Sequence, residues 1–252
     1  MSAILETRGL HKAFGGHVVL DDVSLGFEAR RLSSLIGPNG AGKTTCFNLL
    51  TGFLAPDRGR ILFKGQDVTR LPPDRRARLG ISRSFQVLNL FDDSTVLENV
   101  RVAVPAMRRR GFDCWTPAGA MREAEDRAAR IIRLIGLAGR EHVEARFMSY
   151  GQRRLLEIGV ALAGEPELLL LDEPTSGLGR RPLEALRDLV PRLAEEVTLV
   201  VIEHDMDFVL SLSHHVAVLH RGTVIAEGPP AAVRDNPEVR EAYLGRLRYT
   251  KA

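Results

Sequence analysis

The sequence lacks an apolar run long enough to cross a bilayer. Its longest apolar stretches, around residues 168–171 and 197–202, have the length of strands, whereas a membrane-spanning helix needs about 20 mostly apolar residues. The first ten residues include Glu6 and Arg8, which argues against a secretory signal sequence. We therefore expect the chain to stay in the cytoplasm and to reach a membrane only by attachment to its inner face.

Cysteine and lysine are both scarce. The two cysteines, Cys46 and Cys114, have no metal-ligand spacing and indicate no disulfide framework; Cys46 is expected to be a small residue on a buried helix face. Nearly all of the 35 basic residues are arginine, and 32 acidic residues balance them to a net charge of +3. The basic residues are dispersed, and the one local run, 108–110, reads as a solvated loop. The charge pattern therefore does not predict nucleic-acid binding.

Apolar residues are plentiful, at 44% of the 252 residues, enough for one globular unit with a sub-domain. Residues 1–27 alternate between apolar and polar types, with a turn at Gly15-Gly16, as in an antiparallel hairpin. Further strands are expected at 32–36, 60–63, 168–171, 198–202 and 216–219. Helices are expected at 44–50, stopping near Gly52, and at 182–193, ended or bent by Pro191. The pair Pro72-Pro73 predicts a break in the chain.

A helical segment interrupts this alternation at about residues 87–160. Its apolar stripe at helical spacing consists of Ala128, Ile131, Ile132 and Ile135. Residues 107–119 read as a projecting loop in which Trp115 is a local packing anchor. Buried strands alternating with helices predict a parallel sheet covered on both faces. The predicted fold class is therefore α/β in a single domain, 1–252, with an antiparallel β sub-domain and an inserted helical sub-domain.

The strongest chemical signal is the segment Gly37-Pro38-Asn39-Gly40-Ala41-Gly42-Lys43-Thr44-Thr45. It matches the phosphate-loop pattern G-x-x-x-x-G-K-[ST] and lies, as the pattern requires, between a strand and a helix. Its glycines let consecutive N–H groups and the helix N-terminus point at phosphate. Lys43 is expected to reach the β- and γ-phosphates of ATP, and Thr44 to ligate Mg²⁺. The alternative is a Gly-rich turn that carries a lysine by chance. The match of all eight positions of the pattern argues against it.

An acidic pair follows the apolar strand 168–171. Asp172 and Glu173 emerge at its carboxyl end, where open α/β sheets bind their ligands. Two adjacent carboxylates can divide the duties of metal ligand and base, so we expect Asp172 to hold Mg²⁺ and Glu173 to polarise the attacking water. An acidic cap on the next turn is the alternative for this motif taken alone.

These two motifs define a P-loop nucleotidase without saying which one. GTPases carry an N-K-x-D segment that is absent here. Residues Ser149-Tyr150-Gly151-Gln152, after Met148 and before Arg153-Arg154, resemble the L-S-G-G-Q signature of ABC ATPases, in which each signature contacts the ATP of the partner subunit. Taken alone, this segment would indicate a helix cap; between the two nucleotide motifs it identifies the chain as a member of that family.

Further positions fit the same resemblance, which spans roughly residues 4–245. It implies that Gln86 is a glutamine ligand of Mg²⁺ between core and helical sub-domain, that His204 contacts the γ-phosphate, and that Phe14 stacks on adenine. The alternatives are a loop amide for Gln86, a strand-end cap for His204 and a core aromatic for Phe14.

Within the family, the sequence is most similar to the G-type ATPase of branched-chain amino-acid uptake systems. The similarity rests on Phe85-Gln86, Leu90-Phe91 and residues 95–100, 150–154 and 202–206. It also includes Glu241 to Gly245, within a family-like C-terminal tail at about 228–252. The P-E-G segment of the companion F-type subunits is absent. The resemblance implies a second, F-type-like ATPase subunit, two membrane permeases, a periplasmic binding protein and no nucleic acid. The alternatives are an exporter ATPase of the lipopolysaccharide-export type and a non-transport ABC ATPase.

The sequence departs from the family pattern at two positions. Tyr150 replaces the first glycine of the signature, which the uptake group tolerates. Gly179 stands where most members carry Asp, or Asn in this group, a residue that helps to link the two ATP sites of the dimer. Gly179 therefore predicts either altered coupling with a non-identical partner, or a turn that needs a permissive backbone angle.

Overall fold

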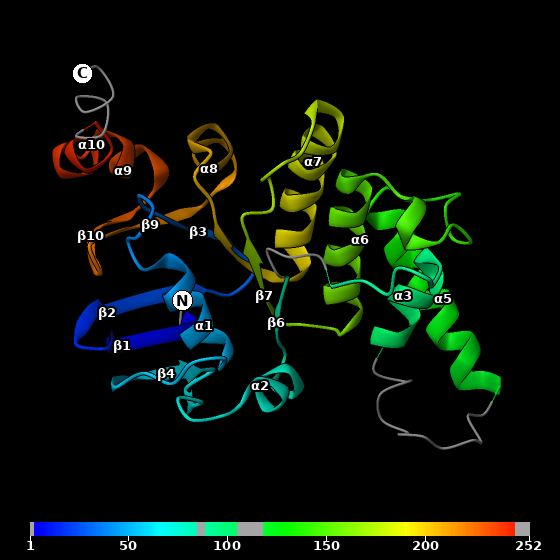
Figure 1. Cartoon of the computed structure of the whole chain (residues 1–252), viewed down its shortest axis with the longest axis horizontal. Helices are drawn as coiled ribbons and strands as arrows, with labels where there is room; N and C mark the ends of the chain where they lie inside the picture. Colours follow the sequence, from blue (N-terminus) through cyan, green and yellow to red (C-terminus); the bar gives the residue numbers. More distant parts are fainter. Residues whose placement is uncertain (1–2, 85–88, 105–117, 245–252) are drawn as a thin grey trace.

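The structure, a computed structural model, describes residues 3–84, 89–104 and 118–244. Predictions that concern Gln86, Cys114, Trp115 and residues 108–110 lie outside the described residues. Figure 1 shows strands and short helices gathered at one end of an elongated molecule and a group of helices projecting at the other. Within the described ranges, no helix is both long and apolar enough to cross a membrane.

The N-terminal strands build an antiparallel sheet. Strands β1 (Ala3–Phe14) and β2 (His17–Glu28) form the predicted hairpin, with Gly15 and Gly16 both at positive φ in its turn. Strands β4 (Arg58–Phe63) and β5 (Gln66–Asp67) complete the order β2-β1-β4-β5. The predicted antiparallel sub-domain is confirmed.

A second sheet carries the predicted parallel core. Its order is β10-β9-β3-β8-β7-β6, and all neighbours are parallel except β10 and β9. Its strands are β3 (Leu32–Ile36), β6 (Ile81–Arg83), β7 (Leu168–Asp172), β8 (Thr198–Ile202), β9 (His215–His220) and β10 (Thr223–Gly228). Sequence patterns missed β6, which has three residues, and β10, a half-exposed edge strand.

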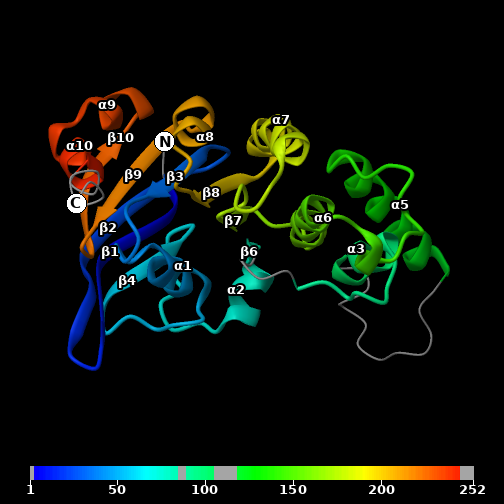
Figure 2. The ribbon, with the colours of Figure 1, turned by 45° about the horizontal axis from the view of Figure 1, so that its top comes forward.

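Strands β3, β7 and β8 are buried along their whole length. On one face, Leu168 and Leu170 pack with the antiparallel sheet and with α1 (Lys43–Thr51). On the other, Leu169 and Leu171 pack with α6 (Tyr150–Ala163) and α7 (Arg180–Glu196). The turned view in Figure 2 shows α7 and α1 on opposite sides of these strands. Burial on both faces explains why β7 and β8 read as nearly continuous apolar runs.

Helix α1 begins at the phosphate loop and ends, as predicted, before Gly52. The buried side chain of Arg76 donates hydrogen bonds to the carbonyls of Leu49 and Leu50 at the end of α1, at 2.6 and 2.7 Å. Burial lowers the pKa of Arg76 to about 10. Cys46 is buried in α1, as predicted, and burial raises the pKa of its thiol to about 12.

The structure bears on two predictions about proline. Pro72-Pro73 does not simply break the chain, because Pro73 is the first residue of α2 (Pro73–Leu79), where its missing N–H costs nothing. Of the two outcomes predicted for Pro191, an end and a bend of the helix, the first is wrong, because α7 continues to Glu196. The helix retains this proline because its buried face, with Leu189 and Leu193, packs against the sheet, and packing outweighs local propensity.

The projecting helices are α3 (Val96–Ala103), α5 (Ala118–Leu134) and α6, with a short 3₁₀ turn at Ala145–Phe147 before α6. All four residues of the predicted apolar stripe, Ala128, Ile131, Ile132 and Ile135, are buried. Helix α5 begins within the segment predicted as a loop at 107–119; most of that segment lies outside the described residues.

The end of the described chain folds back on the core. Helices α8 (Met206–Leu212), α9 (Pro230–Asp235) and α10 (Pro237–Leu244) lie beside β9 and β10. Val233 and Val239 are buried there against Val216 and Val218. This packing brings α10 close to the phosphate loop.

Candidate active site

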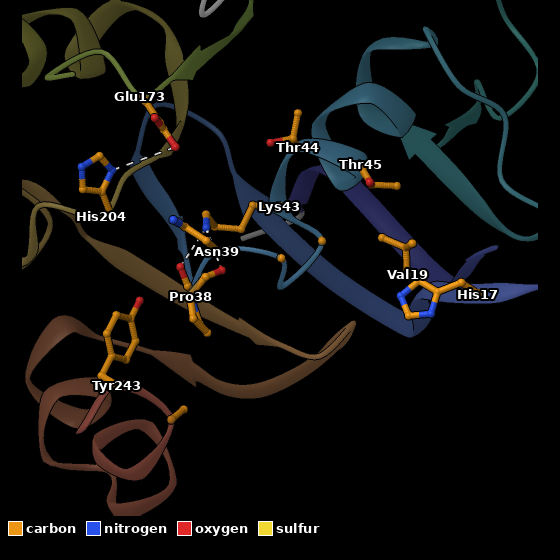
Figure 3. Close-up of a pocket in the computed structure, with 14 residues that line it drawn as sticks. His17, Val19, Pro38, Asn39, Lys43, Thr44, Thr45, Glu173, His204 and Tyr243 are labelled. Atoms are coloured by element: carbon orange, nitrogen blue, oxygen red, sulfur yellow. Dashed lines mark hydrogen bonds and ion pairs between the residues drawn. The ribbon is translucent and has the colours of Figure 1, made fainter. Parts of the chain in front are cut away.

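A cavity of about 840 Å³ opens at the carboxyl ends of the parallel strands (Figure 3). Its lining comes from the phosphate loop, the turns after β7 and β8, the start of β2 and α10. The lining residues are His17, Val19, Gly37, Pro38, Asn39, Gly40, Gly42, Lys43, Thr44, Thr45, Glu173, His204, Ala242 and Tyr243. The structure thus gathers most of the predicted ATP-contacting residues around one space.

The phosphate loop orients Lys43. The Lys43 ammonium donates hydrogen bonds to the carbonyls of Gly37 and Pro38, at 2.8 and 3.1 Å, and its side chain is mostly buried. Ala41, the one loop residue from 37 to 45 outside the lining, is buried. Its carbonyl accepts a hydrogen bond from the Gly222 N–H at 3.1 Å, which ties the loop to the turn between β9 and β10. Helix α1 begins at Lys43, so its unpaired N–H groups and positive dipole end face the loop. This end of the cavity is suited to an anion.

The two adjacent acids have different surroundings. Glu173 lines the cavity with a side chain that is 23% exposed, and its carboxylate lies 4.0 Å from His204 Nδ1. Figure 3 shows the two side chains facing each other above the loop. Asp172 is almost fully buried behind the lining, with its carboxylate 2.5 Å from the guanidinium of Arg83. The structure therefore separates the predicted base from the predicted metal ligand.

Glu173 also has a strained backbone, with φ at +46°. A non-glycine residue in the left-handed region costs free energy and persists where surrounding contacts hold it. Here the Glu173 N–H donates to the carbonyl of Ile202 on β8, at 3.0 Å. This hydrogen bond fixes the direction in which the Glu173 side chain leaves the strand.

Glu203 was missed as a site residue. Its fully buried carboxylate accepts hydrogen bonds from the backbone N–H of Thr175 at 2.8 Å and of His204 at 3.1 Å. It ties the turn after Glu173 to the turn that carries His204. The available signal was an acid directly after a continuous apolar strand and next to His204, the same pattern that identified the acidic pair after β7.

Tyr243 and Ala242 bring α10 into the cavity wall, and no motif predicted either residue. The Tyr243 hydroxyl oxygen is enclosed by protein, and burial raises the pKa of Tyr243 to about 12. His17 and Val19 also line the cavity without having been predicted. Phe14 lies outside the lining, with its ring 46% exposed and 5.4 Å from the Lys12 ammonium.

The signature residues 149–152 also lie outside the lining of this cavity. Ser149 caps α6 in a capping box: the Ser149 N–H donates to the Gln152 side chain at 3.0 Å, and Ser149 Oγ accepts from the Gln152 N–H at 3.4 Å. A Cβ atom on Gly151 would lie 2.5 Å from Pro182 of α7. Within one chain, these residues form a helix terminus packed against α7.

A phosphate loop between a parallel strand and a helix, with a carboxylate pair after a neighbouring strand, defines the class of P-loop nucleotidases. The family described as ABC transporter matches residues 20–176, and the one described as branched-chain amino acid ATP-binding cassette transporter matches residues 223–246. The chain belongs to the ABC transporter family and is one of its ATP-binding, ATP-hydrolysing subunits.

Similar proteins cover nearly the whole chain. The high-affinity branched-chain amino acid transport ATP-binding proteins BraF of Pseudomonas aeruginosa and LivG of Escherichia coli are each 41% identical to it, over 96% of this chain and 98% of theirs. The solved ADP conformation of an ATP-binding cassette of an ABC transporter superposes with a TM-score of 0.85 at 32% identity, over 97% of this chain and 100% of that one. A nucleotide-free ATP-binding cassette gives 0.83 at 32% identity, over 96% and 98%.

Proposed function

We propose that this subunit powers an ABC importer of branched-chain or related amino acids. The observation that carries the proposal is the joint match of the ATPase core and of the C-terminal residues 223–246, where α10 contributes Tyr243 to the cavity. Relatives named for high-affinity branched-chain amino acid transport match over almost the full length of the chain. An exporter or a non-transport ABC ATPase has no such supporting observation.

In the proposed reaction, the phosphate loop and Lys43 bind and orient the phosphates of ATP. Glu173 accepts a proton from the water that attacks the γ-phosphate, and His204 contacts that phosphate. Glu203 holds His204 and the turn after Glu173 in register. Phe14, beside His17 and Val19 at the turn of the hairpin, supplies a flat apolar surface for adenine.

The residues proposed to hold Mg²⁺ suit that ion. Within the part of the chain that the structure describes, no cluster of three or more His, Cys, Asp or Glu could hold a metal unaided. Mg²⁺ is commonly held by one or two protein oxygens together with substrate phosphates, and Thr44, Asp172 and Gln86 supply a hydroxyl, a carboxylate and an amide oxygen. When bound, the ion would neutralise charge that develops on the phosphates.

The position of the signature supports a second ATPase subunit. Because residues 149–152 lie outside this chain's own cavity, we propose that they cover the ATP of a second ABC ATPase, a different and F-type-like chain. Two permeases would anchor the pair to the inner face of the cell membrane, and a periplasmic binding protein would deliver the substrate.

The proposed function is tested by purifying the chain with its permeases and second ATPase and reconstituting the complex in liposomes. ATP inside the liposomes should drive uptake of radiolabelled leucine when the binding protein is present outside, and a Lys43→Ala complex should not. Binding-protein-independent release of a preloaded substrate would instead indicate an exporter.

Lys43→Ala should weaken ATP binding by about 1.5–3 kcal/mol, because it removes charge-assisted hydrogen bonds to phosphate. Titration with a fluorescent ATP analogue measures the change. Lys64→Ala is the matched control, since Lys64 pairs with Glu167 on the surface at 2.6 Å, with both side chains about half exposed. Equal losses in the two variants would mean that Lys43 does not contact the nucleotide.

Gly179→Asp should change the ATPase rate of the assembled complex a few-fold, about 1 kcal/mol in barrier, without changing ATP affinity. Gly179 caps α7 with φ at −72°, and a Cβ there meets nothing within 4 Å. The permissive-angle alternative is therefore wrong, and Asp, a favoured N-cap, should stabilise the helix. Gly179→Ser adds a favoured N-cap that is neither of the two residues the family carries there, and so separates helix stability from coupling. A higher melting temperature with unchanged turnover would exclude a coupling role.

A further inference from the structure

The side chain of Arg83, on β6, is buried and contacts two other elements, β7 and α1. One end of its guanidinium is 2.5 Å from the Asp172 carboxylate at the end of β7, and another nitrogen donates to the Asn48 side chain of α1 at 2.6 Å. Its guanidinium carbon lies 5.8 Å from the centre of the Phe47 ring. The side chains of Arg83 and Asp172 are 8% and 3% exposed.

This pair lies where water cannot screen it. Burying two charges carries a desolvation penalty that is offset only when the geometry and additional hydrogen bonds are good. An arginine side chain keeps its charge in proteins, so the pair cannot be relieved by loss of a proton from Arg83. Removal of either partner leaves a buried charge without its counter-ion, which is strongly destabilising. The folded chain should therefore keep the Arg83–Asp172 pair together unless another cation replaces one partner.

The same carboxylate is the proposed ligand of Mg²⁺. A carboxylate oxygen that accepts a short hydrogen bond from a guanidinium is a weaker ligand, because a cation there must compete with a positive charge already in contact. We propose that Arg83 and the metal compete for Asp172, so that Arg83 holds the carboxylate until Mg²⁺ arrives with the nucleotide. This inference rests on the metal assignment of Asp172 made under the proposed function.

Replacement of Arg83 by the metal at Asp172 would also change how strand β6 is held. Arg83 is the last residue of β6, an edge strand of three residues, and the next residue, Ser84, donates its N–H to Leu170 on β7 at 2.9 Å. The chain then continues towards α3 and the projecting helices. Displacement of Arg83 from Asp172 removes one of the side-chain contacts between β6 and β7. Metal binding is thereby linked to the way the edge strand β6 is held against β7.

The test measures binding of Mn²⁺, a spectroscopic substitute for Mg²⁺, by electron paramagnetic resonance with a non-hydrolysable ATP analogue. Arg83→Met removes the competing charge and keeps an unbranched side chain. It should tighten Mn²⁺ binding about tenfold, the scale of one charge-assisted hydrogen bond. Affinity for the analogue in EDTA should stay unchanged, because no metal then competes for Asp172. Unchanged or weaker Mn²⁺ binding would overturn the proposal.

Two further variants keep the test decisive. Arg83→Gln removes the charge but keeps a hydrogen-bond donor for Asp172, so it is suited to the case in which Arg83→Met does not fold; it should tighten Mn²⁺ binding about threefold, a fraction of a full hydrogen bond, and no change would contradict the competition. Asp172→Asn should weaken Mn²⁺ binding. If Asp172→Asn has no effect, the metal assignment itself is wrong; if it weakens binding while Arg83→Met does not strengthen it, only the competition is wrong. Lys64→Met serves as the surface control.

Discussion

Glu173→Gln is expected to slow ATP hydrolysis in the assembled transporter by about 10²–10⁴-fold, the usual contribution of a positioned general base. The amide has nearly the same shape as the carboxylate but cannot accept a proton from water. ATP should remain bound, because the phosphate loop and Lys43 are untouched. With hydrolysis blocked, two ATPase subunits should stay closed over the nucleotide, and sedimentation with ATP should show the stable pair.

The geometry makes this variant informative. The Glu173 carboxylate is partly open to the cavity and 4.0 Å from His204, so the substitution should leave the melting temperature nearly unchanged. Single-turnover measurements separate the chemical step from binding and product release. Glu167→Gln, at an exposed ion pair with Lys64, is the matched control. Turnover near that of the wild type for Glu173→Gln would remove Glu173 from the role of base.

Features encoded by neighbouring residues were predictable from the sequence. The phosphate loop, the buried strands and the hairpin at Gly15-Gly16 each depend on a local pattern: glycine spacing, a continuous apolar run, or alternation with a turn. The acidic pair was found in the same way. The structure then showed what the pattern could not, namely that Asp172 and Glu173 point into different surroundings and that Asp172 is paired with Arg83.

Features that depend on distant segments were not predictable. Tyr243 lines the cavity only because α10 packs against the β9–β10 edge, and Arg83 meets Asp172 only because β6 pairs with β7, far along the chain. The continuation of α7 through Pro191 is another example, because tertiary packing outweighs a local penalty there. In each case the residue type was visible in the sequence, but its neighbours were not.

Within the phosphate loop, an added Cβ atom would meet its closest neighbour at Gly37. A Cβ atom on Gly37 would lie 2.1 Å from the carbonyl oxygen of Leu219 on β9. That carbonyl cannot simply move, because β9 pairs with β3 through Leu35 and Ile36, directly before the loop. Gly40 differs: it has φ of +82°, but a Cβ there meets nothing within 4 Å. Gly42 is also crowded, since a Cβ there would lie 2.8 Å from the carbonyl oxygen of Val19. The loop therefore contains glycines required by close approach, Gly37 and Gly42, and one, Gly40, required only by backbone conformation.

Gly37→Ala should lower the free energy of unfolding by about 2–5 kcal/mol, the sum of an overpacking cost and a disfavoured backbone angle, and should abolish ATP binding. Gly40→Ala carries only the backbone cost of about 1–2 kcal/mol and should retain weakened binding. Urea unfolding and titration with a fluorescent ATP analogue measure the two quantities. Equal losses of stability would mean that β9 yields to the added methyl group. The variants should differ because a methyl group on Gly37 meets the backbone of the core sheet, whereas one on Gly40 does not. A change at Gly37 therefore disturbs both the phosphate-binding loop and the sheet that supports it.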